Sequence, residues 1–169
     1  VLYVVIRTFG VVWRSPKMIR NRMSMRSKER SVRLHHEALD YIGRGLSRKA
    51  MKKLDSSIST DQTNINAVID RMNVAAEQGD FKTISEHAEK LIAQDPQHKT
   101  FVFSHACRLL IGLEEYSSAQ KFADQLIEES SKNSEARKLL FAIKSAVGDP
   151  TIIDQLPKYA KIIDEEILS

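Results

Sequence analysis

The sequence has little of what disulfide-rich, metal-binding or disordered proteins are built from. Its 169 residues include a single cysteine, Cys107, so no internal disulfide bond can form and no pair of cysteines can begin a zinc site. Six glycines, four prolines and the lack of any long polar low-complexity tract argue against a disordered chain. Alternating β-branched and aromatic residues are scarce. We therefore expect an almost wholly helical protein, and a reducing compartment is natural for it.

The residue patterns of an enzyme site are also missing. His35 and His36 are adjacent, so on a helix they point about 100° apart and cannot share a metal ion. The chain has neither a His-Glu-x-x-His pair nor the Gly-x-Gly-x-x-Gly dinucleotide fingerprint. It also lacks the Cys-x-x-Cys-His motif of haem attachment. We expect no catalytic residue, no metal site and no required cofactor.

The net charge of +4 hides a strong asymmetry along the chain. Residues 1–60 contain 14 Lys and Arg against 4 Asp and Glu, whereas residues 61–169 contain 12 against 18. Such a split predicts that the basic part faces an anionic surface and that the acidic part is a solvated domain. With 42% hydrophobic residues over its 169 positions, the chain can bury a core in one domain of ordinary size.

Residues 1–13 form a strongly apolar run that only Arg7 and Thr8 interrupt. At 1.5 Å per residue, a helix of this length covers about 20 Å, less than the roughly 30 Å hydrocarbon core of a bilayer. The run alone cannot cross a membrane, but it fits the end of a spanning helix. Because the chain starts abruptly in apolar sequence without Met, we expect a fragment of a longer protein.

Residues 14–30 are basic, with Glu29 as the only acidic residue among them. Lys and Arg directly after an apolar segment hold that flank on the cytoplasmic side and are attracted to anionic lipids. A core helix with a solvated basic face is the alternative. Nucleic-acid binding is weaker, because Met and Ile rather than stacking aromatic residues lie between the basic ones. The predicted membrane-surface residues are Trp13, Arg14, Lys17, Arg20, Arg22 and Arg26.

Residues 72–96 contain half of a helix, a Gly-Asp-Phe turn, a second amphipathic helix and a closing Asp-Pro. This pattern resembles a tetratricopeptide repeat, in which two antiparallel helices of about 34 residues form one stackable unit. A shift of 34 residues places Gly45 on Gly79, and a further shift of 35 places Phe81 on Tyr116. The resemblance implies that the turn aromatic wedges between the helices of its own unit. Small residues, Cys107 among them, allow close helix packing.

The predicted fold is all-α. Antiparallel helix pairs of tetratricopeptide type, in residues 31–60, 64–97, 99–132 and 134–169, stack into a right-handed solenoid that continues beyond the fragment. A non-repeating helical bundle is the alternative.

The first helices of successive repeats line the inner, concave surface of such a solenoid, which is where we expect a protein partner to bind. Asn side chains there can bind backbone amides, and Arg or Lys can bind carboxylates. The match to a tetratricopeptide carboxylate clamp is incomplete, and a merely solvated face is the alternative. The predicted partner-binding residues are His35, Asn66, Ile69, Asn73, Phe101, Arg108, Arg137, Phe141 and Lys144.

The order of a membrane-helix end, a basic stretch, repeats and the segment Leu156 to Lys161 resembles the N-terminal region of HemY-type proteins of proteobacterial haem operons. The resemblance implies a non-catalytic scaffold on the bacterial inner membrane, with cytoplasmic repeats that dock protein partners, including haem-pathway enzymes. Two alternatives remain: a haem or porphyrin carrier, and a basic helical nucleic-acid-binding protein.

Overall fold

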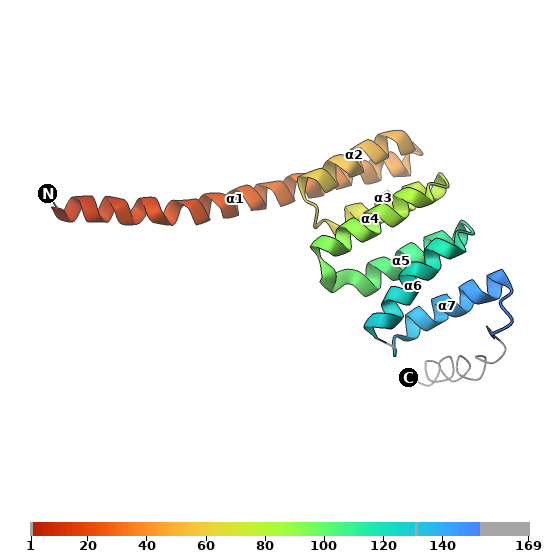
Figure 1. Ribbon diagram of the computed structural model, residues 1–169. Coiled ribbons are helices and arrows are strands. Elements are labelled where there is room, and N and C mark those ends of the chain that lie inside the picture. The colour runs from red at the N-terminus through yellow and green to blue at the C-terminus, as the bar shows by residue number, and fades with distance from the viewer. Residues whose placement is uncertain (1, 131, 153–169) are drawn as a thin grey trace, which may run out of the picture. The chain divides into compact units, whose positions relative to one another are not determined.

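Every regular element of the described structure is a helix. A computed structural model describes residues 2–130 and 132–152, with side chains from Arg22 onward, and no strand occurs among these residues. Figure 1 shows the helices in chain order. The elements are α1 (Leu2–Gly43), α2 (Ser47–Thr60), α3 (Ile65–Glu77), α4 (Phe81–Gln94), the 3-10 helix η1 (Pro96–His98), α5 (Lys99–Gly112), α6 (Tyr116–Glu129) and α7 (Ser134–Val147).

The chain divides into two compact units, residues 1–67 and 68–169, and the boundary falls inside α3. The first unit contains α1, α2 and the first turn of α3. The second contains the rest of α3 and the helices α4 to α7. The predicted second helix of the last repeat, which includes Leu156 to Lys161, lies outside the described residues.

In the first unit, α1 and α2 form an antiparallel hairpin. The hydroxyl of Ser27 donates to the carbonyl of Thr60, the last residue of α2, so α1 continues beyond the end of α2 (Figure 1). Ala38, Ala50 and Leu54 are fully buried in this unit. The small side chains of Ala38 and Ala50 allow the two helix backbones to approach closely, and Leu54 fills the space beside them.

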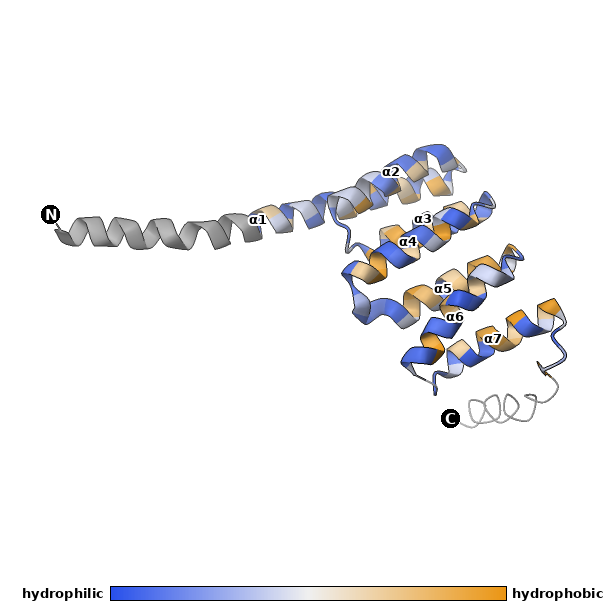
Figure 2. Cartoon of the chain, in the orientation of Figure 1, coloured by the Kyte–Doolittle hydropathy of each residue, from blue (hydrophilic) through white to orange (hydrophobic). Residues whose placement is uncertain are grey.

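In the second unit, α5 is the central helix and contacts α4, α6 and α7. Its buried residues occupy most of its circumference: Val102, Phe103, Ser104, Ala106, Cys107 and Leu110. Figure 2 shows α5 largely in hydrophobic colours. By contrast, α4 and α6 are amphipathic and bury one stripe each, at Ile84, Ala88 and Leu91 and at Ala119, Phe122, Ala123 and Leu126. A helix that is apolar on most sides is the one that must be enclosed by others.

The turns that follow α1, α3, α5 and α7 share one backbone geometry. Gly45, Gly79, Glu114 and Gly148, at intervals of 34, 35 and 34 residues, all have a positive φ between 61° and 73°. At the second turn, the amide of Gly79 donates to the carbonyl of Ala76, and the amide of Asp80 donates to Ala75. This is the Schellman arrangement, which satisfies the last carbonyls of a helix and reverses the chain. The repeat interval found in the sequence therefore reappears as a repeated backbone turn.

Two side chains differ from what the repeat pattern predicts. Phe81 does not wedge between the helices of its own unit. As the first residue of α4 it leaves 42% of its surface exposed, because the buried stripe of this helix begins one turn later at Ile84. In α2, the helical spacing of Ala50 and Leu54 predicts Ile58 as the next residue of the buried stripe. Ser57 is fully buried instead and Ile58 only partly, so the buried stripe is turned by one residue and contains a polar group.

Residues 2–13 belong to α1, which runs without a break from Leu2 to Gly43. Within the described part of the chain, no helix combines the length and the apolar character needed to cross a bilayer. The end of a membrane helix at residues 1–13 stays a prediction, as does the right-handed stacking of the repeats.

Candidate functional site

Four polar side chains connect α3, α5 and α7 in the second unit: Asn73, His105, Arg108 and Glu135. We call them the polar row. The Nε2 of His105 lies 2.8 Å from the Oδ1 of Asn73, which joins α5 to α3. The guanidinium of Arg108 donates to the carboxylate of Glu135, which joins α5 to α7. The row thus crosses the first helices of three successive repeats, which is where the sequence predicts a binding face.

His105 is a neutral hydrogen-bond donor in this row. Partial burial lowers the pKa of His105 below its ordinary value of 6.5, and the neighbouring Arg108 guanidinium lowers it further, while the carboxylate of Asp70 opposes both effects. Because the Oδ1 of Asn73 can only accept, the neutral imidazole must carry its proton on Nε2. His105 therefore donates to the Asn73 side-chain oxygen, and the NH2 group of Asn73 does not take part in this hydrogen bond.

The Arg108–Glu135 ion pair lies close to solvent. The Arg108 side chain is 58% exposed and that of Glu135 is 34% exposed. Pairs of this exposure contribute only ~0–1 kcal/mol to stability. Glu135 also lies in the first turn of α7, just after Asn133, whose side chain accepts from the Ala136 amide as the helix cap. A carboxylate in that turn interacts favourably with the helix dipole, independently of Arg108.

Phe101 lies on the same side of α5 as His105 and Arg108, four and seven residues before them. Its ring is 57% exposed, which is unusual for a phenylalanine in a helix otherwise rich in buried residues. Seven residues of helix place Phe101 about 10 Å from Arg108 along the axis. One side of α5 therefore presents an apolar ring, an imidazole and a guanidinium in sequence.

On α7, three further predicted residues recur at helical spacing. Arg137, Phe141 and Lys144 are each partly exposed and lie at intervals of four and three residues. The Nζ of Lys144 is 3.9 Å from the carboxylate of Asp149 and 3.5 Å from the hydroxyl of Thr151, in the turn that follows α7. Lys144 is thus directed to the end of its own helix.

The remaining predicted residues do not join the row. His35 is only 8% exposed and shares the buried stripe of α1 with Ser31 and Ala38, at spacings of four and three residues, so it differs from the predicted partner-facing position. Asn66 is exposed at the start of α3 in the first unit, and Ile69 is partly exposed on α3 in the second.

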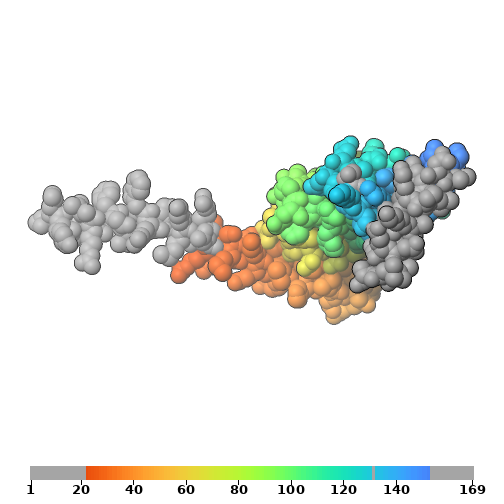
Figure 3. Space-filling view, turned by 90° about the horizontal axis from the view of Figure 1, so that it is seen from below, coloured from red at the N-terminus to blue at the C-terminus, as the bar shows by residue number. Residues whose placement is uncertain are grey.

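Of the predicted membrane-surface residues, the structure describes two side chains. Arg22 and Arg26 are exposed on the part of α1 that precedes Ser27, the residue that contacts the end of α2. Met23 and Met25 beside them are 67% and 64% exposed. In Figure 3 the coloured part of the chain begins with this segment of α1. The side chains of Trp13, Arg14, Lys17 and Arg20 lie outside the described part.

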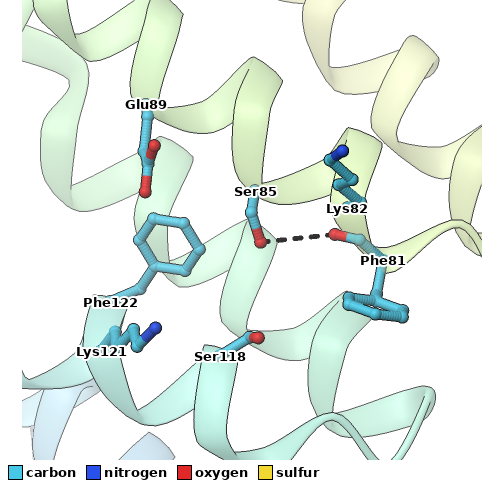
Figure 4. Close-up of a pocket in the computed structure, with 7 residues that line it drawn as sticks. All are labelled: Phe81, Lys82, Ser85, Glu89, Ser118, Lys121 and Phe122. Carbon is cyan, nitrogen blue, oxygen red and sulfur yellow. Dashed lines mark hydrogen bonds between the residues drawn. The ribbon is translucent and has the colours of Figure 1, made fainter.

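A pocket of about 210 Å³ between α4 and α6 was not predicted from the sequence. Phe81 and Phe122 provide its apolar walls, and in Figure 4 the Ser85 hydroxyl points to the carbonyl of Phe81, to which it donates at 3.3 Å. Lys82, Glu89, Ser118 and Lys121 complete the lining. No sequence signal marks this pocket, because it depends on how two second helices of neighbouring repeats meet.

His105 and Glu135 were also missed as site residues. Register positions indicate which face of a helix is shared, but they do not say which polar side chains on neighbouring helices pair. The one available signal for Glu135 was its place in the first turn of a predicted helix, where acidic residues are favoured.

Cys107 has the environment of a packing residue. Its thiol is fully buried and donates to the carbonyl of Ala119 at 3.2 Å. Burial raises the pKa of Cys107 to about 12, so the thiol stays protonated at neutral pH. Among the described residues, no three His, Cys, Asp or Glu side chains come together as a metal site requires.

Together, antiparallel helix pairs and a turn that recurs every 34 or 35 residues define a helical-repeat protein of tetratricopeptide type. Solved structures support this class. The chain is similar to a tetratricopeptide repeat protein from Parabacteroides merdae, with a TM-score of 0.61, 20% identity, and coverage of 80% of this chain and 52% of that one.

A second likeness is to the first tetratricopeptide domain of Spaghetti (RPAP3), a structure that contains a bound HSP90 peptide, SRMEEVD. The TM-score is 0.56 at 16% identity, over 72% of this chain and 96% of that one. The first such domain of human RPAP3 gives 0.53 at 17% identity, over 72% and 98%. These likenesses show the fold.

No protein-family model matches the chain. No curated protein matches it either. The relation to HemY-type proteins therefore stays a prediction.

Proposed function

We propose that this protein is a non-catalytic adaptor that binds a segment of a partner protein across α3, α5 and α7 of its second unit. The polar row carries this proposal. It offers the Asn73 amide donors to a peptide backbone and the Arg108 guanidinium to a carboxylate, and Phe101 adds an exposed apolar ring on the same side of α5. Hydrogen-bonding groups beside an exposed aromatic ring suit an extended or helical peptide better than a small metabolite.

The RPAP3 likeness supports protein partners in general, because that domain was solved with a peptide. Its acidic heptapeptide, SRMEEVD, is therefore a reasonable first probe for this chain. Binding can be measured by fluorescence anisotropy of the labelled peptide. We refer to it below as the acidic heptapeptide.

The partner itself is best sought by site-specific photo-crosslinking in cells. Crosslinkers at positions 73 and 108 should capture a discrete protein that a crosslinker at the exposed Gln120 of α6 does not. The captured protein is then purified and titrated against the wild-type chain and the Arg108→Glu, Arg137→Glu double variant, which should bind more weakly at unchanged helicity. Equal labelling from all three positions, or equal binding by the variant, would contradict the proposed face.

We further propose that α1 holds this adaptor at an anionic membrane surface. The support is the exposed pair Arg22 and Arg26 with Met23 and Met25 between them, together with the apolar run that precedes them in the sequence. Co-sedimentation with phosphatidylserine-rich vesicles, compared with neutral phosphatidylcholine vesicles, tests this. Arg22→Glu, Arg26→Glu should reduce binding, whereas the same charge change at Lys52 and Lys90 should reduce it less.

We propose, from the sequence resemblance to HemY-type proteins, that the adaptor acts at the bacterial inner membrane in the late steps of haem biosynthesis. Identification of a haem-pathway enzyme by the crosslinking experiment would support this setting, and capture only of unrelated proteins would oppose it. The alternative of a haem or porphyrin carrier is separated by a hemin titration, in which a carrier gives a shifted Soret band that substitution of a histidine removes.

A further inference from the structure

Arg108 already holds a carboxylate of its own chain. Its guanidinium donates to Glu135 on α7, and a partner carboxylate would seek the same donors. A planar guanidinium binds a carboxylate best through two parallel hydrogen bonds, so Glu135 and an incoming carboxylate compete for one group.

We propose that Glu135 is an internal competitor for Arg108, which a carboxylate of the partner must displace. The proposal rests on the proposed function and specifies how the polar row selects its ligand. Binding is then an exchange: the partner carboxylate takes the guanidinium, and Glu135 is released to the first turn of α7. A segment that offers no carboxylate leaves the pair intact and gains nothing from Arg108.

Three features make this exchange feasible. Arg108 is 58% exposed, so the partner reaches the guanidinium without opening the core. Glu135 is 34% exposed, so its carboxylate can turn away without being buried alone. Its position in the first turn of α7 gives the released carboxylate a favourable place near the helix N-terminus. The exchange therefore costs less than the removal of a buried carboxylate from its only partner.

The same geometry describes the ligand. Phe101 and Arg108 lie about 10 Å apart along α5, so the preferred segment has an apolar side chain roughly that far from its carboxylate. Between them, His105 and Asn73 form the polar contact that faces the middle of the segment. The segment is therefore acidic at one end and apolar near the other.

The test compares four proteins: wild type, Glu135→Gln, Arg108→Gln and the double variant. Glu128→Gln on α6 is the matched control, because it removes the same charge from an exposed position on another helix. Each is titrated with the acidic heptapeptide and with a neutral counterpart, in which Glu and Asp are replaced by Gln and Asn and the C-terminus is amidated.

We expect Glu135→Gln to bind the acidic heptapeptide about twofold to fivefold more tightly than wild type, the factor expected when one solvent-exposed competing ion pair is removed. Arg108→Gln should bind the acidic heptapeptide weakly. The Arg108→Gln, Glu135→Gln double variant should bind it just as weakly. The neutral peptide should show no gain. Thermal unfolding distinguishes a structural role, which would make Glu135→Gln less stable without making it bind more tightly.

Two results would overturn the inference. If Glu135→Gln and wild type bind the acidic heptapeptide equally, Glu135 does not compete, although the binding itself would support the proposed function. If neither binds it, carboxylate exchange at Arg108 is refuted. The proposed adaptor function is then judged separately by the crosslinking from positions 73 and 108, which requires no carboxylate in the partner.

Discussion

Ser31 and Ser57 exchange hydrogen bonds in both directions between α1 and α2. The hydroxyl of Ser31 donates to the Ser57 carbonyl at 2.9 Å, and the hydroxyl of Ser57 donates to the Ser31 carbonyl at 2.8 Å. Both residues are fully buried. The amide of Asn64 donates to the Ser31 hydroxyl at 2.9 Å, and its carbonyl oxygen accepts from the Ala67 amide in the first turn of α3. This network fixes the register of the first hairpin and the start of the next helix together.

Ser31→Ala should therefore cost about 1–2 kcal/mol of unfolding free energy, because it removes the fully buried hydroxyl that is the nearest acceptor of the partly buried Asn64 amide. Ser59→Ala, on the exposed side of α2, should change it by less than about 0.5 kcal/mol. Urea unfolding followed by circular dichroism measures both. The Ser31→Ala, Ser57→Ala double variant should cost less than the sum of its single variants, since each single change already breaks the shared network. Strict additivity would show that the two hydroxyls act independently.

Glu114 is the one described residue other than glycine with a positive φ, at 61°. It holds the turn position that Gly45, Gly79 and Gly148 occupy elsewhere, and a side chain in this conformation costs about 1–2 kcal/mol. Glu114→Gly should stabilise the protein by about 0.5–1 kcal/mol, after the greater flexibility of glycine in the unfolded chain is subtracted. Gly79→Ala should destabilise it by about 1 kcal/mol. The midpoint of thermal unfolding should rise for the first variant and fall for the second, and opposite signs would refute the shared turn geometry.

His105 should make stability depend on pH. Its pKa in the folded protein lies below the ordinary 6.5, so between these two values the unfolded chain binds more protons than the folded one. The contribution of His105 to the free energy of unfolding is fully present above pH 6.5. It is lost as the pH drops from 6.5 through the pKa of His105 in the folded protein. His105→Gln, which can still meet Asn73, should flatten the pH dependence of the unfolding midpoint over that range. Gln120→Ala, which changes no titratable group at an exposed position on α6, is the control and should leave the dependence unchanged.

The helical class and the pairing of helices are predictable from sequence because both depend on spacing. Residues such as Ala50, Leu54, Ala88 and Leu91 recur on one face at helical intervals, and all four are buried. Periodicity alone gives the face but not the contacts on it. The expected burial of Phe81 fails for this reason, since a residue at the first position of a helix can meet the next repeat as easily as its own.

The candidate site is only half predictable. Asn73, Phe101 and Arg108 follow from the register, because the first helices of repeats share one side. Their pairing with His105 and Glu135 depends on side-chain rotamers and on the spacing between helices, which cannot be predicted from the sequence of one helix. Likewise, the exchange between Ser31 and Ser57 joins residues 26 positions apart, and serine in an apolar stripe gives no sign of which other serine it meets.

Finally, α1 joins the basic residues and the first hairpin as one helix of 42 residues, about 63 Å long. A continuous helix transmits rotation as well as distance. Each residue added before Ser27 would turn the hairpin by about 100° relative to whatever surface holds the basic arm, and about 18 residues would complete five turns and restore its facing. The number of residues in α1 before Ser27 therefore sets the direction in which the first hairpin faces.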